Sequence, residues 1–215
     1  MEGQILQPIG PWTPPLEFST RLPLTIAIVA DTHVPDRFKH LHPQLLSTLR
    51  RHNPDLILHA GDICAPKVLR TLATLAPVVA VRGNRDWAFQ NILPWKRDFT
   101  LGGVMITLTH GHGSWRTYLL DKWQYLFNGY QPERYRRRLL ALAPTARVII
   151  FGHTHRPIVE WYQERLFLNP GSASAGVKPN DLPSFGVLRI QSPEQVSASI
   201  YPLPPFPRWG ASSDT

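Results

Sequence analysis

The chain has 215 residues, and its 23 basic and 15 acidic side chains give a formal net charge of +8. A hydrophobic content of 43% indicates one folded domain and excludes an intrinsically disordered chain. No apolar run approaches the ~18 residues of a transmembrane helix, the N-terminus lacks the features of a secretory signal, and a single cysteine, Cys64, excludes an internal disulfide. We therefore expect a cytoplasmic protein with no membrane partner.

The first half of the chain predicts strands that alternate with helices. Residues 1–23 contain five prolines and no clear period, so we expect an extended N-terminal arm that lies along the domain through Trp12 and Phe18. Short apolar runs predict buried strands at 25–30, 55–60 and 77–81, with amphipathic helices at 43–52 and 66–75 between them. This order is typical of parallel strands joined by helical crossovers.

The second half predicts hairpins. Strands at 98–101 and 104–109 flank Gly102-Gly103, which suits a two-residue turn, whereas strands at 159–162 and 165–168 flank the less suitable Gln163-Glu164. Further strands are predicted at 148–151, 184–190 and 196–201, and the Pro-rich tail at 202–215 is expected to be irregular. The predicted fold class is α/β, with two mixed β-sheets packed face to face and helices outside, in a domain that spans residues 24–201.

Polar side chains follow five of the predicted strands. The groups are Asp31-Thr32-His33, Gly61-Asp62, Gly83-Asn84, His110-Gly111-His112 and Gly152-His153-Thr154-His155. Ligands of open α/β sheets bind outside the carboxyl ends of the strands, so these five loops are expected to form one pocket. Because the side chains offer imidazole, carboxylate and amide groups without a thiolate, they favour Mn, Fe, Zn, Co or Ni.

The number of predicted ligands indicates two ions. The ligands are Asp31, His33, Asp62, Asn84, His110, His153 and His155. One tetrahedral zinc needs about four ligands, and a catalytic site leaves one position open for water, so seven are too many for one ion. Two ions that share a carboxylate, with Asp62 as the bridge, suit displacement at phosphorus. We expect two divalent ions, with Mn²⁺ preferred and Fe, Zn, Ni or Co as alternatives.

The five motifs, in this order, resemble those of the calcineurin-like metallophosphoesterases. The later Asn169-Pro170-Gly171-Ser172 resembles the N-P-G-S turn of their small single-domain phosphodiesterase branch. The resemblance covers roughly residues 25–199 and implies a four-layer sandwich of two mixed β-sheets flanked by helices. It also implies two ligand sets: Asp31, His33, Asp62 and His155 for the first metal, and Asp62, Asn84, His110 and His153 for the second.

Three residues beside the ligands are candidates for catalytic roles, namely His112, Arg85 and Asp86. His112 can protonate the leaving alkoxide or hydrogen-bond a phosphate oxygen, or it can be a solvent-exposed loop histidine. Arg85 stands where the larger protein phosphatases of the family have His and where the small branch typically has Cys. It can clamp a phosphate through its guanidinium or pair with Asp86 alone, and it cannot usefully donate a proton at neutral pH.

A helical insertion is predicted at about residues 114–143. Aromatic and apolar residues at helical spacing predict one helix up to Phe127, and a second helix starting near Pro132 carries Arg134, Arg136, Arg137 and Arg138. This insertion can overhang the pocket as a substrate-recognising cap, pack its aromatic face on the domain, or form the contact of a homo-oligomer. A basic surface near a phosphate site attracts anionic substrates.

These features predict a dinuclear metal-dependent phosphoesterase that hydrolyses phosphodiesters by attack of a metal-bridging hydroxide. The expected substrate is a small phosphodiester or a nucleotide-like molecule. One alternative is a non-catalytic metal-binding interaction module on the same fold, because the family that the chain resembles includes non-catalytic members such as a subunit of an endosomal sorting coat. Another is a nuclease, because the basic, aromatic insertion would suit nucleic acid. All seven ligand positions are filled, which favours catalysis.

Overall fold

The structure is a computed structural model that describes residues 16–113, 131–178 and 180–206. Its first sheet has the strand order β10-β9-β1-β2-β3. The strands β1 (Leu24–Val29), β2 (Leu56–His59) and β3 (Val78–Ala80) run parallel, whereas β9 (Ser184–Ile190) pairs antiparallel with β1 and β10 (Val196–Pro202) pairs antiparallel with β9. The three parallel strands are those predicted in the first half of the chain.

The second sheet has the order β4-β5-β6-β8-β7. Its three central strands, β5 (Val104–Thr109), β6 (Val148–Ile150) and β8 (Arg165–Pro170), run parallel. The edge strands β4 (Lys96–Leu101) and β7 (Pro157–Tyr162) complete the two predicted hairpins. Both central residues of each hairpin turn have positive φ, including the non-glycines Gln163 (48°) and Glu164 (61°).

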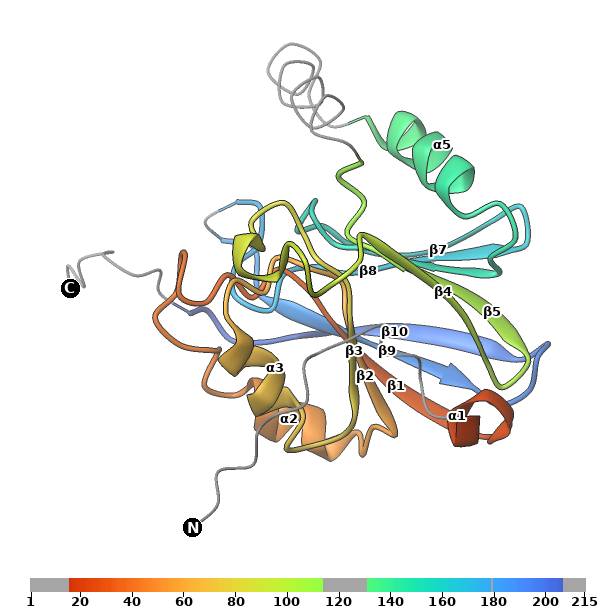
Figure 1. The fold of residues 1–215 in the computed structure, drawn as a ribbon, viewed down its shortest axis with the longest axis horizontal. Coiled ribbons are helices and arrows are strands. Elements are labelled where there is room, and N and C mark those ends of the chain that lie inside the picture. Colours follow the sequence, from red (N-terminus) through yellow and green to blue (C-terminus); the bar gives the residue numbers. More distant parts are fainter. Residues whose placement is uncertain (1–15, 114–130, 179, 207–215) are drawn as a thin grey trace.

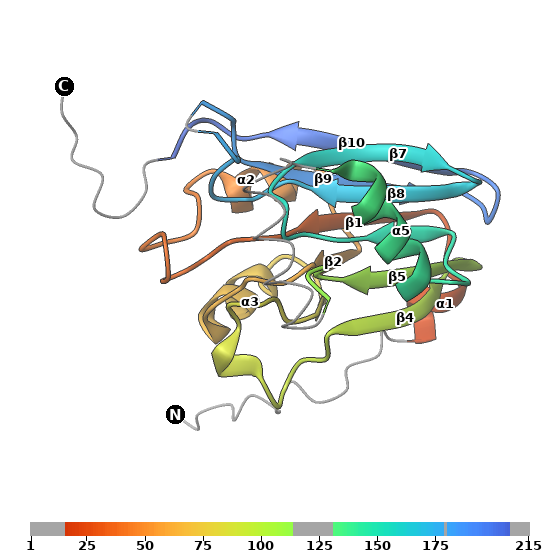
Figure 2. The ribbon, with the colours of Figure 1, turned by 90° about the horizontal axis from the view of Figure 1, so that it is seen from above.

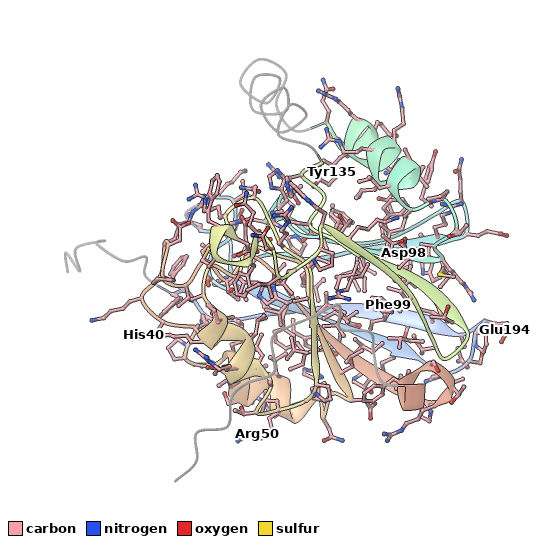
Figure 3. All side chains as sticks on the ribbon, viewed as in Figure 1. His40, Arg50, Asp98, Phe99, Tyr135 and Glu194 are labelled. Atoms are coloured by element: carbon pink, nitrogen blue, oxygen red, sulfur yellow. The ribbon has the colours of Figure 1, made fainter. Side chains whose placement is uncertain are left out.

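Helices cover the outer faces of the two sheets (Figure 1; Figure 2). The helices α2 (Leu45–Arg51) and α3 (Pro66–Leu72) pack on the first sheet, and α5 (Pro132–Leu142) packs on the second. A short 3₁₀ helix, η1 (Trp87–Phe89), follows β3. Buried aliphatic side chains from both sheets fill the space between them (Figure 3), among them Ile26, Leu58, Ile106, Ile150 and Leu168. This order of layers, helix, sheet, sheet and helix, confirms the predicted α/β fold class.

The expectation of an extended arm is wrong for its last part. Residues Leu16–Thr20 form a short helix, α1, and Phe18 is buried in the core between the sheets. The carbonyl of Ser19 accepts a hydrogen bond from the Gly102 N–H in the β4–β5 turn. Burial of the Phe18 ring thus anchors a segment that was expected to be extended and to lie on the domain surface. Residues 1–15 of the arm, with Trp12, and the first predicted helix of the insertion lie outside the described residues.

Candidate metal centre

The loops that carry the seven predicted ligands meet at one end of the two sheets. In the first sheet, β1 is followed by Asp31 and His33, β2 by Asp62, and β3 by Asn84. In the second sheet, β5 is followed by His110, and β6 by His153 and His155. The carboxyl ends of these strands lie on the same side of the molecule, so ligands from both sheets lie close together. The structure brings all seven side chains into one cluster.

Asp31, His33 and His155 form one half of this cluster. The Nε2 atoms of His33 and His155 lie 3.1 Å apart, and His155 Nε2 lies 3.5 Å from Asp31 Oδ1. One ligand atom from each of the three side chains lies within 4.8 Å of the other two. The two nitrogens must either share a proton or direct their lone pairs at a common cation, so this geometry suits a metal ion.

Asn84, His110 and His153 form the other half. The Asn84 Oδ1 atom lies 3.1 Å from His110 Nε2 and 3.0 Å from His153 Nδ1. The His153 backbone N–H donates to Asp31 Oδ2 at 3.0 Å, which ties the two halves together. An amide oxygen and two ring nitrogens at this spacing offer three ligand atoms to a second ion.

Asp62 lies between the two halves. Its Oδ2 atom is 3.7 Å from His33 Nε2, and its Oδ1 atom is 3.5 Å from His110 Nε2. Each carboxylate oxygen therefore faces a different half of the cluster. This is the position that a carboxylate shared by two ions would occupy.

Hydrogen bonds on their far sides orient two of the histidines toward the cluster. The Nδ1–H of His110 donates to the Ala60 carbonyl at 2.7 Å, and that of His155 donates to the Ala175 carbonyl at 3.2 Å. In each ring this leaves the Nε2 lone pair facing the other ligands. Burial lowers the pKa of His33 to about 2, which keeps its imidazole neutral near pH 7. Two anchored rings and a neutral His33 suit a divalent metal ion.

Two groups of the cluster, Asp62 and His110, have raised pKa values. Burial raises the pKa of Asp62 to about 6, although the charge of His110 opposes that rise. For His110, burial lowers the pKa, but the carboxylates of Asp62 and Asp31 outweigh burial and raise it above its usual value. A proton is thus retained most readily around Asp62 and His110, and a bound metal ion would have to displace it.

The ligand loops adopt a backbone conformation that non-glycine residues rarely take. Positive φ angles occur at Asp31 (53°), His33 (50°), Asp62 (54°), His153 (69°) and His155 (55°). Each such residue costs about 1–3 kcal/mol unless its surroundings hold it in place. Backbone hydrogen bonds from Asp31 to Gly61 and from His33 to Asp62, both 3.0 Å long, join the two loops. The cluster is therefore built at a strained edge, as functional sites often are.

The Asn169-Pro170-Gly171-Ser172 turn supports two of the ligand loops. Asn169 Nδ2 donates to the Gly152 carbonyl at 2.9 Å and to Thr154 Oγ1 at 3.1 Å, within the loop that carries His153 and His155. Ser172 Oγ donates to the Asp31 carbonyl at 2.8 Å. The sequence indicates this turn only through the family resemblance, and it does not predict the supporting contacts because no local pattern links the turn to loops so distant in the chain.

Asp86 ties together the loops that follow β2 and β3. Its Oδ1 atom accepts the backbone N–H groups of Ile63 (2.8 Å) and Cys64 (2.7 Å), and its Oδ2 atom accepts that of Gly83 (2.7 Å). Burial raises the pKa of Asp86, against the opposing effect of these hydrogen bonds. The carboxylate thus holds the backbone around Asp62 and Asn84, and a direct part in catalysis stays a prediction.

Arg85 pairs with a residue that the sequence analysis did not consider. Its guanidinium Nη1 lies 2.8 Å from Asp36 Oδ2, and its backbone N–H donates to Asp62 Oδ1 at 2.9 Å. The alternative in which Arg85 pairs with Asp86 is wrong, because the Asp86 oxygens accept backbone N–H groups instead. The side chains of Arg85 and Asp36 are 38% and 33% exposed, which leaves the guanidinium accessible beside the cluster.

His112 is buried next to the second half of the cluster. It is only 3% exposed, so its interpretation as a solvent-exposed loop histidine is wrong. Its ring lies 4.7 Å from that of Trp95, 5.2 Å from that of His110 and 6.0 Å from that of His153. Burial, with the nearby charges of His110, Arg82 and Arg138, lowers the pKa of His112 to about 3. The neutral ring near pH 7 offers an N–H as a hydrogen-bond donor.

The arginines of α5 do not act as one surface. The predicted second helix of the insertion begins at Pro132, as expected, whereas residues 114–130 lie outside the described residues. Arg136 donates to Glu133 and Glu160 and lies over the ring of Tyr162 at 4.4 Å, which anchors the helix to β7. Arg137 is exposed. The role of the insertion as a cap stays a prediction, and in the described part Arg136 contacts the domain itself.

Comparisons with known proteins find relatives that are described as probable metallophosphoesterases. A sequence relative described as a probable metallophosphoesterase, from Methanothermobacter thermautotrophicus, is 34% identical over 177 residues, which cover 82% of this chain and 91% of the relative. Another, from Methanocaldococcus jannaschii, is 29% identical over 180 residues, which cover 84% of this chain and 82% of the relative.

In the part of the chain that the structure describes, no helix is long and apolar enough to cross a membrane.

Solved structures with a similar fold include two of Vps29 from Entamoeba histolytica. A single-site variant superposes with a TM-score of 0.63 at 24% identity, covering 84% of this chain and all of that one. The wild-type protein, in a complex with Zn²⁺, has a TM-score of 0.56 at 25% identity and covers 83% of this chain and 99% of that one. The sequence model of the calcineurin-like phosphoesterase superfamily domain matches residues 24–193. This chain belongs to the calcineurin-like phosphoesterase superfamily.

Proposed function

We propose that this protein hydrolyses phosphodiesters with the help of two divalent metal ions. The observation that carries the proposal is the place of Asp62, whose two oxygens face the two halves of the ligand cluster at 3.7 and 3.5 Å. In this proposal Asp31, His33, Asp62 and His155 hold the first ion, and Asp62, Asn84, His110 and His153 hold the second. Mn²⁺ is the preferred metal, and Zn²⁺, Fe, Ni and Co suit the same ligands.

Divalent ions bound at such a site lower the pKa of bound water and neutralise charge on the phosphoryl oxygens. The residues of the chain supply orientation and hydrogen bonds. In this proposal His112 donates its ring N–H to a phosphate or leaving-group oxygen, and Arg85 holds a second phosphoryl oxygen through its guanidinium. Because Arg85 replaces the histidine of the larger protein phosphatases, we expect phosphomonoesters with poor leaving groups to be weak substrates.

The test is hydrolysis of bis-p-nitrophenyl phosphate by chelator-stripped protein, with Mn²⁺, Ni²⁺, Zn²⁺ or no metal added back. p-Nitrophenyl phosphate is assayed in parallel, and Asp62→Asn and His153→Ala serve as inactive controls. The proposal expects cleavage of the diester that requires metal and is abolished in both variants. Tight, stoichiometric metal binding without turnover for any metal would contradict it.

That contrary result would favour the second candidate, a non-catalytic metal-binding module on the same fold, and the Zn²⁺ complex of Vps29 shows that a protein with a similar fold binds a metal ion. In that case the same cluster would bind metal ions to shape a surface for another protein. The two functions can be told apart by measurement, because in the non-catalytic module the wild type hydrolyses no ester and Asp62→Asn changes only metal binding and partner binding.

A further inference from the structure

His33 presents one ring nitrogen to the cluster and the other to a different set of groups. Its Nε2 atom lies among Asp31, Asp62 and His155. Its Nδ1 atom is shielded from solvent, and no group in the described ranges hydrogen-bonds it. The side chain is 1% exposed, so water does not fill that role readily. A buried ring nitrogen without a partner is unusual and calls for a physical account.

The carboxylate of Asp36 lies just beyond hydrogen-bond distance of this nitrogen. Asp36 Oδ2 is 3.6 Å from His33 Nδ1, and the same oxygen is 2.8 Å from Arg85 Nη1. A hydrogen bond to His33 would require an approach of about half an ångström. One carboxylate oxygen therefore stands between a predicted metal ligand and the arginine proposed to hold substrate.

Metal binding would change what the Nδ1 atom needs. When Nε2 directs its lone pair at a cation, the proton of the neutral ring must reside on Nδ1. That buried N–H then requires an acceptor, as ligand histidines elsewhere in the cluster find in the carbonyls of Ala60 and Ala175. Asp36 is the carboxylate placed to serve His33 in this way.

We propose that Asp36 is a positioning residue that orients His33 for the first metal ion and couples that ion to Arg85. When a phosphate group occupies the guanidinium of Arg85, Oδ2 of Asp36 is released to accept the His33 N–H. Binding of phosphate and binding of the first ion thus favour each other. The coupling to substrate rests on the proposed function, whereas the effect on metal affinity does not.

A separate ion held by His33, Asp36 and Cys64 is a less suitable explanation of the same geometry. Ligand atoms of these three side chains do lie within 4.8 Å of one another. However, the Arg85 cation already contacts Asp36, and burial with the nearby carboxylates raises the pKa of the Cys64 thiol, which disfavours a thiolate ligand.

The first experiment measures Mn²⁺ affinity by electron paramagnetic resonance of the free ion. In Asp36→Asn we expect one of two Mn²⁺ ions to bind about 10–100-fold more weakly, and Asp36→Glu should restore much of that affinity. Arg85→Gln should not weaken binding. The control is Glu194→Gln, which removes one negative charge at the end of the sheets opposite the cluster (Figure 3) and should bind both ions normally. Equal thermal unfolding midpoints of the metal-free variants show that each folds.

The second experiment repeats the titration with inorganic phosphate present. Phosphate should tighten Mn²⁺ binding by a larger factor in the wild type than in Asp36→Asn or Arg85→Gln. Wild-type affinity in Asp36→Asn would overturn the positioning role, and an equal phosphate effect in all three proteins would overturn the coupling. If the wild type binds two Mn²⁺ ions but hydrolyses no ester, the proposed function fails and the role of Asp36 at His33 is still decided by these titrations.

Discussion

Among single residues, the metal centre depends on Gly83, whose surroundings leave no room for a side chain. A Cβ atom on Gly83 would overlap Asp62 Oδ1 and lie 2.5 Å from the Asp62 backbone nitrogen. We expect Gly83→Ala to displace Asp62, weaken Mn²⁺ binding by about 10–100-fold, as loss of a supporting contact typically does, and abolish diester cleavage. Equilibrium dialysis against Mn²⁺ measures the first effect.

The matched control for this variant is Gly186→Ala in β9. There a new Cβ would meet its closest neighbour, Ile28 Cβ, at 3.4 Å, which is an ordinary contact distance. Gly186→Ala should therefore bind metal like the wild type. Normal Mn²⁺ affinity in Gly83→Ala would mean that the position of Asp62 does not limit metal binding.

His112 offers a residue-scale test of substrate contacts apart from metal contacts. Its ring stands 5.2 Å from that of His110, and in the proposed function it donates an N–H to a reacting oxygen. We expect His112→Ala to keep both Mn²⁺ ions and to lower kcat for the diester by about 10²–10³-fold, the usual cost of losing one such donor. Steady-state kinetics at saturating Mn²⁺ provide the measurement, and undiminished turnover would remove His112 from the mechanism.

At the scale of elements, the N-P-G-S turn after β8 acts as a brace for the loop after β6. Asn169 donates two hydrogen bonds into that loop, and its own Oδ1 atom accepts the Gly171 N–H at 2.9 Å. We expect Asn169→Ala to destabilise the fold by about 1–3 kcal/mol, since it removes two hydrogen bonds worth about 0.5–1.5 kcal/mol each, and to weaken metal binding. Denaturant unfolding with and without Mn²⁺ measures both effects.

Asn169→Asp sharpens this test because it keeps the shape of the side chain and one acceptor but loses both donors. It should weaken Mn²⁺ binding as much as Asn169→Ala. The exposed helix variant Ser47→Ala, far from these loops in the chain, should change neither stability nor affinity appreciably. If both Asn169 variants bound metal normally, the turn would support the fold alone.

The regular elements were predictable because their signals are local. Apolar runs of about five residues mark the strands, and turn residues such as Gly102-Gly103 mark a hairpin. The hairpin through Gln163-Glu164 formed despite a turn pair that disfavours positive φ, since the pairing of β7 with β8 overrides it. Helix α1 was missed because burial of Phe18 by distant strands, rather than local spacing, stabilises it.

At the scale of the whole molecule, the order of motifs predicted the seven clustered residues, whereas their environment came only from the fold. Asp36 pairs with Arg85, which is 49 positions further along the chain, and lies 3.6 Å from His33 Nδ1, and no sequence motif indicates either contact. Likewise, the burial of His112 depends on packing against Trp95. Side-chain type and strand order thus reveal which residues meet, and tertiary packing decides which partners each one has.

The whole molecule should register metal binding as a gain in stability that depends on pH. An ion that binds only the native state raises the free energy of unfolding by about 2.7 kcal/mol when its free concentration is about 100 times its Kd. For a chain of this size, that corresponds to a rise of about 5–10 °C in Tm. The pKa of Asp62 is raised to about 6, so below that pH the ion must displace its proton. The Mn²⁺-induced rise in Tm should therefore be complete at pH 8 and decline as the pH falls through 6. Differential scanning calorimetry at pH 8 and pH 5 measures it, and Asp62→Asn should show a smaller rise with less pH dependence. An equal rise at both pH values in the wild type would mean that Asp62 carries no proton for the metal to displace.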